Sequence, residues 1–273
     1  MNPPSLSTLS LSLEQGIAEI RLNRPDKSNA MNDAMWQEIR QAFDWVDATP
    51  EARVAILSGA GRNFCAGIDL TLLAGIQQRI AHPDAARSRE ALRRLILDLQ
   101  DCLSSVERCR KPVLAAIQGA CIGGALDLVT SCDMRYAAAD AVFSVREIDL
   151  GMVADVGTLQ RLPRLIGDGM ARELAYTGRN FTADEAERMG LANRIFASPE
   201  ALTAAVREIA ATIAAKSPLA TRGLKEVMNF SRDHSVADGL NFVATWNAAL
   251  LLSGDLSESM LAMREKRAPR FAD

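Results

Sequence analysis

The amino-acid sequence predicts an α/β fold with parallel strands. Two short apolar stretches, VAILSG at 54–59 and VLAAIQG at 113–119, end in glycine and precede helix-like segments. Recurring strand–turn–helix units of this kind are typical of parallel sheets. The 273 residues are 48% hydrophobic and 24% charged, which is ordinary globular usage and allows a large buried core.

The N-terminal elements follow from their hydrophobic patterns. LSLSLEQGIAEIRLN, residues 9–23, alternates apolar and polar residues on both sides of a Gln-Gly turn and predicts a hairpin. MNDAMWQEIRQAFDWVD, residues 31–47, repeats apolar residues at helical spacing, and Asn32 can cap this helix. The apolar face of the helix consists of Met35, Ile39, Phe43 and Val46.

The middle of the chain continues the same alternation. REALRRLILDLQDCLSSVERC, residues 89–109, predicts the strongest helix, and IGGALDLVTSCD, residues 122–133, predicts a short apolar one. MRYAAA at 134–139 and AVFSV at 141–145 read as strands. Thr182 and Glu185 form a capping box for a helix that ends at Gly190.

A change of character near Ser198 predicts two parts. Ser198 and Pro199 begin a helix, and residues 198–265 look helical almost throughout. We therefore expect residues 1–197 to form a core that carries the active site and residues 198–273 to form a helical C-terminal domain. No Gly/Ser linker separates them, so the two should pack together or against another subunit.

Composition excludes several classes of function. A net charge of −3 argues against nucleic-acid binding and a polybasic membrane patch, and no apolar run is long enough to span a membrane. The five cysteines form no CxxC pair, and His82 and His234 lack a second ligand at metal spacing, so no metal site is expected. With reduced thiols and no visible targeting segment, we expect a cytoplasmic protein. Because neither histidine is expected in a metal or catalytic cluster, any acid–base chemistry must be carried out by carboxylates.

Two glycine-containing turns could bind a developing negative charge. FCAGIDL runs from Phe64 to Leu70, and GACIGGALDL from Gly119 to Leu128 opens on a helix. Glycine lets backbone N–H groups approach a ligand, and two amides aimed at one point would make an oxyanion hole. The alternative is that both are only tight strand-to-helix turns. The second turn is not GxGxxG, so a dinucleotide site is not expected.

Four carboxylates lie near these turns in otherwise apolar sequence: Asp127, Glu147, Asp149 and Asp155. Each could cap a helix or pair with a nearby arginine, such as Arg146, Arg161 or Arg164. Several carboxylates beside a candidate oxyanion hole favour general acid–base catalysis instead, with burial raising their pKa values.

Four segments together resemble the enoyl-CoA hydratase/isomerase (crotonase) family, in order and across nearly the whole chain. They are NFCAGIDL, ACIGGALDL, FSVREIDLGMVADVGTLQRLPRLIG and SGDLSESMLAMREKRAPRF. The resemblance implies a spiral core of ββα repeats, a helical C-terminal part used in trimerisation, and a homotrimer or a hexamer of paired trimers. It also implies thioester substrates of coenzyme A and no separate cofactor.

The resemblance also implies roles for residues of the turns. The backbone N–H groups of Ile68 and Gly124 would form the oxyanion hole for the thioester enolate. Ala66, Gly67, Ile68, Asp69 and Leu70 would shape the coenzyme A groove, and KSNAMN, which contains Lys27 and Ala30, resembles its other wall. Lys225 and the basic MREKR segment could meet coenzyme A phosphates, although a solvated helical face is the favoured interpretation.

The carboxylates decide the reaction within this family. Hydratases carry two glutamates that activate water, whereas this chain has Asp127 in place of the first and adds Asp155 to Glu147. That set is similar to the dienoyl-CoA isomerases, which move two double bonds toward the thioester in fatty-acid β-oxidation. The proton leaves carbon 2 and another joins carbon 6, roughly 5 Å away, so one carboxylate cannot serve both positions.

We assign Glu147 to carbon 2 and Asp155 to carbon 6, with Asp127 tuning Glu147; the reverse assignment of Glu147 and Asp155 stays open. Asp149 is expected to be structural. The alternatives are an enoyl-CoA hydratase and a non-catalytic crotonase-like protein that binds acyl-CoA or RNA.

Overall fold

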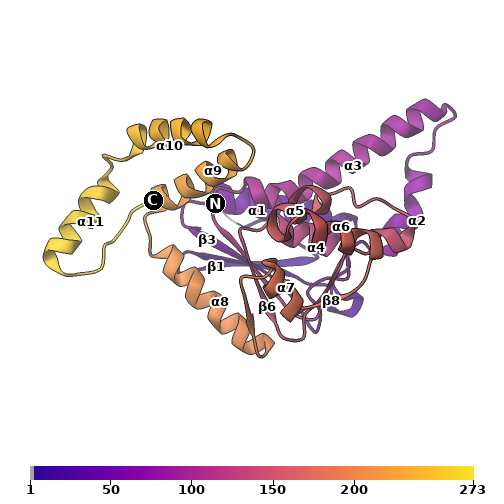
Figure 1. The fold of residues 1–273 in the computed structure, drawn as a ribbon, viewed down its shortest axis with the longest axis horizontal. Coiled ribbons are helices and arrows are strands. Elements are labelled where there is room, and N and C mark those ends of the chain that lie inside the picture. Colours follow the sequence, from indigo (N-terminus) through magenta and orange to yellow (C-terminus); the bar gives the residue numbers. More distant parts are fainter. Residues whose placement is uncertain (1–2) are drawn as a thin grey trace.

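The computed structural model describes residues 3–273 and contains two β-sheets surrounded by helices (Figure 1). The larger sheet has the strand order β1-β2-β3-β4-β6-β9, and the smaller one has the order β5-β7-β8. Strands β2, β3, β4, β6 and β9 run parallel, while β1 pairs antiparallel with β2. The parallel α/β architecture predicted from the sequence is therefore confirmed.

The strands are β1 (Leu9–Glu14), β2 (Ile17–Leu22), β3 (Val54–Gly59), β4 (Val113–Ile117), β5 (Ala120–Ile122), β6 (Met134–Ala138), β7 (Val142–Ser144), β8 (Phe181–Thr182) and β9 (Arg194–Phe196). The helices are α1 (Asp33–Ala48), α2 (Leu70–Arg79), α3 (Ala85–Arg108), α4 (Gly124–Thr130), α5 (Thr158–Ile166), α6 (Asp168–Thr177), α7 (Ala183–Met189), α8 (Pro199–Ala214), α9 (Pro218–Arg232), α10 (Val236–Leu250) and α11 (Gly254–Glu265). Two short 3-10 helices are η1 (Pro25–Lys27) and η2 (Glu147–Leu150).

Local sequence signals account for the predicted elements. The Gln15–Gly16 turn joins β1 to β2, and both residues have positive φ angles. Asn32 accepts a hydrogen bond from the Met35 amide at the start of α1, and Thr182 and Glu185 form the predicted capping box of α7. The expected apolar face of α1 is fully buried.

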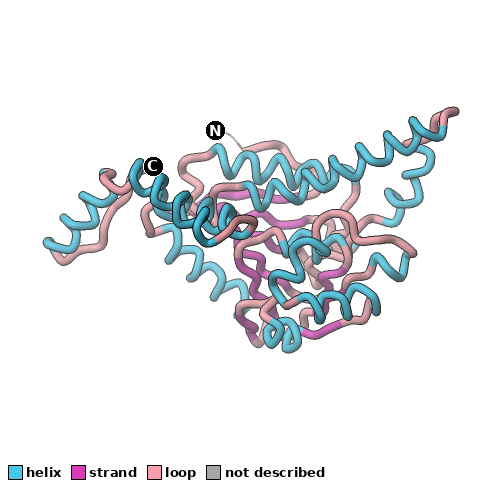
Figure 2. Tube along the Cα trace, turned by 45° about the horizontal axis from the view of Figure 1, so that its top comes forward, coloured by secondary structure: helices cyan, strands magenta, loops and turns pink. Residues whose placement is uncertain are grey.

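The core lies on both faces of the larger sheet. Residues of α1 and α3 pack against one face together with alternate side chains of β3 and β4, such as Leu57 and Ala115. The opposite face, which includes Val54 and Leu114, is covered by Val206 and its neighbours on α8. The first helix after Ser198 thus packs directly on the sheet, while α10 and α11 extend away from it (Figures 1 and 2). The domain boundary near Ser198 stays a prediction.

Lys225 joins helix α9 to the core, and the solvent-exposed position predicted for it is wrong. Lys225 was expected on a solvated helical face or against coenzyme A phosphates, yet it is buried. Its Nζ donates to Asp133 Oδ2 at 2.8 Å and to the backbone oxygens of Lys111 and Val106. A lysine in a helical sequence looks solvated because nothing local shows that a distant aspartate will cover it.

Candidate active site

The two glycine turns meet edge to edge. Cys65 pairs with Cys121 in an isolated parallel bridge, in which the Cys65 amide donates to Ala120 O at 2.9 Å. Gly67 is buried and has a φ of 91°, and a Cβ at this position would lie 2.6 Å from Ile122 O. Only glycine permits this close approach, because any side chain would push the turns apart.

This contact places the two predicted oxyanion-hole amides beside each other. Met31 donates to Gly67 O at 2.8 Å and accepts from the Asp69 amide at 3.0 Å, so the intervening Ile68 N–H faces away from Met31. Gly124 opens α4, and its nitrogen lies 3.5 Å from the position that a Cβ on Gly67 would take. Within residues 3–273, neither the Ile68 nor the Gly124 amide donates a hydrogen bond. Both are available to a ligand.

The Cys65 thiol is part of the same turn. Its Sγ donates to Asn29 O at 3.0 Å and accepts from the Gly67 amide at 3.4 Å. Burial raises the pKa of this thiol to about 12, so it stays protonated. Cys65 therefore serves the packing of the turn.

The predicted coenzyme A groove has two walls that the structure joins. Ala66 donates to Ser28 O at 2.9 Å, and Arg24 forms an ion pair with Asp69 at 2.9 Å while also donating to Ala30 O. Lys27 is exposed on the wall formed by residues 27–30, and Leu70 is exposed at the start of α2 on the other wall. Asp69 also accepts from the Thr71 amide and so caps α2, which gives it a structural role beside the predicted binding role.

Sequence reasoning missed Arg24 and Asn29, which hold these walls. Asn29 is fully buried, and its Nδ2 donates to the backbone oxygens of Ala60, Asn63 and Phe64. Its Oδ1 accepts from the Arg24 amide at 2.8 Å. An asparagine next to a charged turn resembles part of an ordinary surface loop, and its role becomes visible only when the segment after β3 is placed beside it.

Asp127 lies in the first turn of α4 and is completely buried. Its Oδ1 accepts from the Thr158 amide at the start of α5, whereas its Oδ2 has no hydrogen-bond partner among the described residues. Burial raises the pKa of Asp127 to about 6, although the hydrogen bond from Thr158 opposes the rise. The carboxylate is thus held in place by one oxygen and left free at the other.

Glu147 follows β7 and opens η2, directly against the second glycine turn. Its Oε1 lies 3.1 Å from where a Cβ on Gly123 would stand, next to the Gly124 amide. Burial raises its pKa to about 7, and the negative charges of Asp127 and Asp155 add to the rise. Its Oε2 is buried without a hydrogen-bond partner among the described residues.

Asp155 lies in the loop between η2 and α5 and lines a cavity of about 970 Å³. The residue as a whole is exposed, but partial burial of its carboxyl raises its pKa above the ordinary value. The charge of Asp155 raises the pKa of both Asp127 and Glu147, and the charge of Asp127 raises that of Glu147, so the structure brings the three carboxylates within electrostatic range of one another. Asp149 falls outside the group and forms an ion pair with Arg146 at 3.0 Å, in keeping with the structural role expected for it.

The functional groups of this site are carboxylates and backbone amides, and the described residues include no candidate metal centre. Residues 3–273 contain no group of three or more His, Cys, Asp or Glu side chains suited to a metal ion. His82 Nδ1 accepts from the Asp84 amide, and His234 stacks on Phe230. No helix in this part of the chain is both long and apolar enough to cross a bilayer. The arrangement can stabilise an oxyanion and move protons between carboxyl groups and a bound carbon acid.

Comparison with known proteins agrees with this geometry. The family model described as enoyl-CoA hydratase/isomerase matches residues 12–273. This chain belongs to the enoyl-CoA hydratase/isomerase family. A crystal structure of an enoyl-CoA hydratase from Bacillus anthracis superimposes with a TM-score of 0.88 at 32% identity, covering 97% of this chain and 99% of that one. The predicted crotonase-type fold is thereby confirmed.

Two relatives within the family are isomerases by name. The peroxisomal Δ(3,5)-Δ(2,4)-dienoyl-CoA isomerase of Arabidopsis thaliana is 46% identical over 98% of this chain and 97% of its own length. The mitochondrial Δ(3,5)-Δ(2,4)-dienoyl-CoA isomerase of Homo sapiens is 45% identical over 94% of this chain and 78% of its own length. The expectation of a cytoplasmic location is wrong, since these relatives are peroxisomal and mitochondrial. Free cysteines argue against disulfides but do not identify a compartment.

Replacing Asp127 by Asn should stabilise the protein in a pH-dependent way. The folded-state pKa of about 6 lies above the ordinary 3.8, so folding opposes ionisation. The wild type therefore loses stability as pH rises from about 4 through 6, by on the order of 3 kcal/mol when ionisation is complete. The substituted amide cannot ionise, yet its oxygen can still accept from Thr158. Thermal melts should show a higher Tm for Asp127→Asn at pH 8 and little difference at pH 4.

If Asp127→Asn and the wild type had equal Tm values at pH 8 as well as at pH 4, burial would not oppose ionisation of Asp127. Asp168→Asn is a suitable control, because Asp168 is exposed and pairs with Arg172 on the surface. Its Tm should follow the wild type across the same pH range.

Proposed function

We propose that this protein converts 3,5-dienoyl-CoA to 2,4-dienoyl-CoA in fatty-acid oxidation. One observation carries the proposal: the charge of a third carboxylate, Asp155, acts on Asp127 and on Glu147, and Glu147 lies against the turn whose Gly124 amide is free. The names of the Arabidopsis and human relatives support the same reaction.

The thioester carbonyl would bind the amides of Ile68 and Gly124. Removal of a proton from carbon 2 places negative charge on that oxygen, and fixed N–H donors stabilise the charge without reorganising. Because the amides sit at the contact between the two turns, the oxygen would be held from two sides. The coenzyme A moiety of the bound substrate would then extend from the oxyanion hole along the groove walls that contain Lys27, Ala30 and residues 66–70.

Glu147 would remove the proton from carbon 2, because its carboxyl lies against the turn that carries the Gly124 amide. Electrons from the broken C–H bond form an enolate conjugated with both double bonds, and its collapse moves these double bonds toward the thioester as carbon 6 accepts a proton. Asp155 would supply that proton. The reaction needs no cofactor, since one proton is lost and one gained with no change of oxidation state.

Asp127 would act on Glu147 without exchanging protons with the substrate. Its negative charge raises the pKa of Glu147, which makes Glu147 a stronger base. A hydratase reaction is the second candidate, because the family includes hydratases such as the Bacillus anthracis protein. That reaction is disfavoured here, since Asp127 gives one oxygen to Thr158 and has a shorter side chain with which to hold a water.

We also propose that α10 and α11 carry the interface of a homotrimer, alone or paired into hexamers. Both helices extend away from the sheet, and large apolar side chains are exposed on and beside them, including Leu252 at 92% and Met263 at 80%. Apolar surface of this extent is costly in water and marks protein–protein contacts.

Asp155→Asn should abolish isomerisation while leaving the fold and coenzyme A binding intact. The amide occupies the same volume but cannot donate and regain a carboxyl proton at carbon 6. Growth of conjugated-thioester absorbance from 3,5-dienoyl-CoA measures the rate, and calorimetry with coenzyme A measures binding. Near-normal turnover by Asp155→Asn would contradict the three-carboxylate mechanism. Wild type that hydrates crotonyl-CoA rapidly and leaves 3,5-dienoyl-CoA unchanged would favour the hydratase.

The pH dependence of kcat/KM should be bell-shaped. Turnover requires an ionised Glu147 and a protonated Asp155, so the group of carboxylates must retain a proton. The last proton of this group leaves with a pKa of about 7, that of Glu147, and the active form carries this proton on Asp155, so the rate should fall as pH rises past about 7. Complete protonation at low pH should reduce it too. A rate that stayed constant from pH 5 to pH 9 would contradict this requirement.

Charged substitutions on the terminal helices should dissociate the assembly. Leu252→Glu combined with Met263→Glu would place two charges in the proposed interface, and light scattering should then report a monomer. Tyr176→Glu, at an exposed position on α6, serves as the control and should keep the wild-type mass. A wild type that is monomeric at micromolar concentration would refute the proposed interface.

A further inference from the structure

The C-terminal half of α3 has a polar face that borders the cavity behind Asp155. Gln100, Ser104 and Glu107 follow one another at spacings of four and three residues, which places them on the same side of the helix. The adjoining side of this half buries Leu99, Leu103 and Val106 in the core. A polar face turned toward an active-site loop needs a reason beyond solvation.

Each residue of this polar face holds the segment that carries Asp155. Gln100 Nε2 donates to the backbone oxygen of Asp155 at 2.6 Å. Arg161, in the first turn of α5, donates from Nη2 to Ser104 Oγ at 3.2 Å and to Glu107 Oε2 at 3.0 Å. The polar face thus holds the segment just at Asp155 and again six residues later.

The guanidinium of Arg161 also packs on the backbone between these two points. A Cβ at Gly157 would overlap Arg161 Nη1, so the arginine side chain fits only because position 157 has no side chain. Gly157 has a φ of 133°, which disfavours other residues as well. The segment from Asp155 to Thr158 is therefore confined between α3 and the side chain of Arg161.

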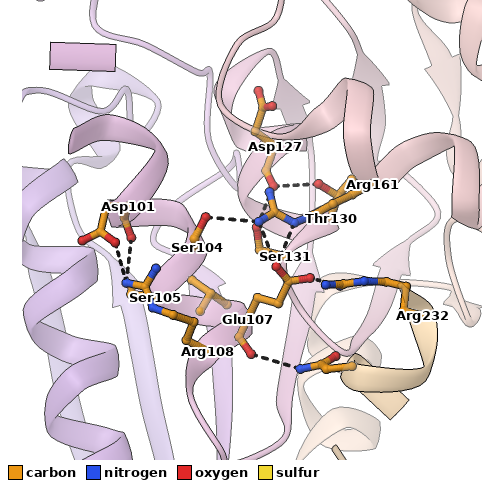
Figure 3. Close-up of polar contacts among 12 residues, drawn as sticks. Asp101, Ser104, Ser105, Glu107, Arg108, Asp127, Thr130, Ser131, Arg161 and Arg232 are labelled. Carbon is orange, nitrogen blue, oxygen red and sulfur yellow. Dashed lines mark hydrogen bonds and ion pairs between the residues drawn. The ribbon is translucent and has the colours of Figure 1, made fainter. Parts of the chain in front are cut away.

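Glu107 extends the network to α9 (Figure 3). Its carboxylate also pairs with Arg232, and its backbone oxygen accepts from Asn229 Nδ2 at 3.5 Å. The side chains of Glu107 and Arg161 are only 20% and 15% exposed. Burial raises the pKa of Glu107, but hydrogen bonds from Arg161 and Arg232 outweigh it and lower the pKa below the usual value.

We propose that Gln100, Glu107 and Arg161 are positioning residues that set Asp155 for protonation of the distal carbon. Asp155 belongs to a loop and is not itself part of a strand or helix, so the position of its carboxyl depends on the contacts that hold that loop. Proton transfer requires hydrogen-bond reach, and a displacement of about 1 Å can reduce a rate by about 100-fold. The inference rests on the proposed isomerisation. It predicts that the two proton-transfer steps can be separated.

The test follows two proton transfers of 3,5-dienoyl-CoA in D₂O, the loss from carbon 2 and the addition at carbon 6. Exchange at carbon 2, read by mass spectrometry of recovered substrate, reports Glu147 and the oxyanion hole. Appearance of the 2,4-dienoyl product reports transfer to carbon 6. The variants are Gln100→Leu and Glu107→Gln. Asp101→Asn is the control, because Asp101 lies on the same helix but pairs with Arg40 and Arg108, and none of these three residues lines the cavity.

Gln100→Leu and Glu107→Gln should lower product formation about 10- to 100-fold while carbon 2 exchange stays within about 3-fold of wild type. Asp101→Asn should change neither rate. The double variant Glu107→Gln with Arg161→Gln should be no slower than Glu107→Gln alone, because the two side chains act as one unit.

Three outcomes are distinguishable. A parallel fall of exchange and product would mean that the α3 polar face supports the whole fold, which would overturn the positioning role. Unchanged product formation in Gln100→Leu and Glu107→Gln would overturn it as well. A wild type that exchanges carbon 2 but forms no 2,4-dienoyl product would reject the proposed function itself.

Discussion

The contact of Gly67 with the backbone oxygen of Ile122 is the constraint on which the site depends. It brings the 65–68 turn and the β5–α4 turn together, and thereby places the amides of Ile68 and Gly124 side by side. The two turns follow β3 and β4, which are neighbours in the parallel sheet. Because parallel neighbours end at the same edge, the sheet delivers both turns to one place, and a missing side chain allows them to touch.

The carboxylates around this contact lower stability. Asp127 and Glu147 each keep one buried oxygen without a hydrogen-bond partner among the described residues, which a purely structural carboxylate would not do. Burial, together with the charges of neighbouring carboxylates, raises their pKa values to about 6 and about 7, into the range where a proton can be exchanged at neutral pH. The chain gives up folding free energy at these positions and gains groups that can accept and release protons.

Much of the fold could be predicted from the sequence because its signals are local. The Gln15–Gly16 turn, the Asn32 cap and the Thr182–Glu185 capping box each act within a few residues, and all three occur where expected. The glycine turns and the carboxylates were singled out from residue types and their place in the sequence, and the family resemblance assigned their roles. The structure brings the two turns, Asp127 and Glu147 together. Their catalytic roles stay predictions.

The features that sequence reasoning missed depend on partners far away along the chain. Lys225 is covered by Asp133, Arg24 reaches Asp69, and Glu107 joins Arg161 to Arg232. In sequence, each of these residues looks like an ordinary surface charge. Nothing at one position shows which distant residue will share its site, so the polar face of α3 became visible only with the fold.

The Cys65 thiol gives the oxyanion turn a particular redox character. With a pKa of about 12, only about one thiol in 10⁵ is ionised at neutral pH, and oxidants and alkylating reagents attack the thiolate. The sulfur is also enclosed between Asn29 and Gly67. Chemical inertness of this thiol and correct spacing of the two amides therefore come from the same packing, so that thiol labelling at Cys65 would record how often the turn opens.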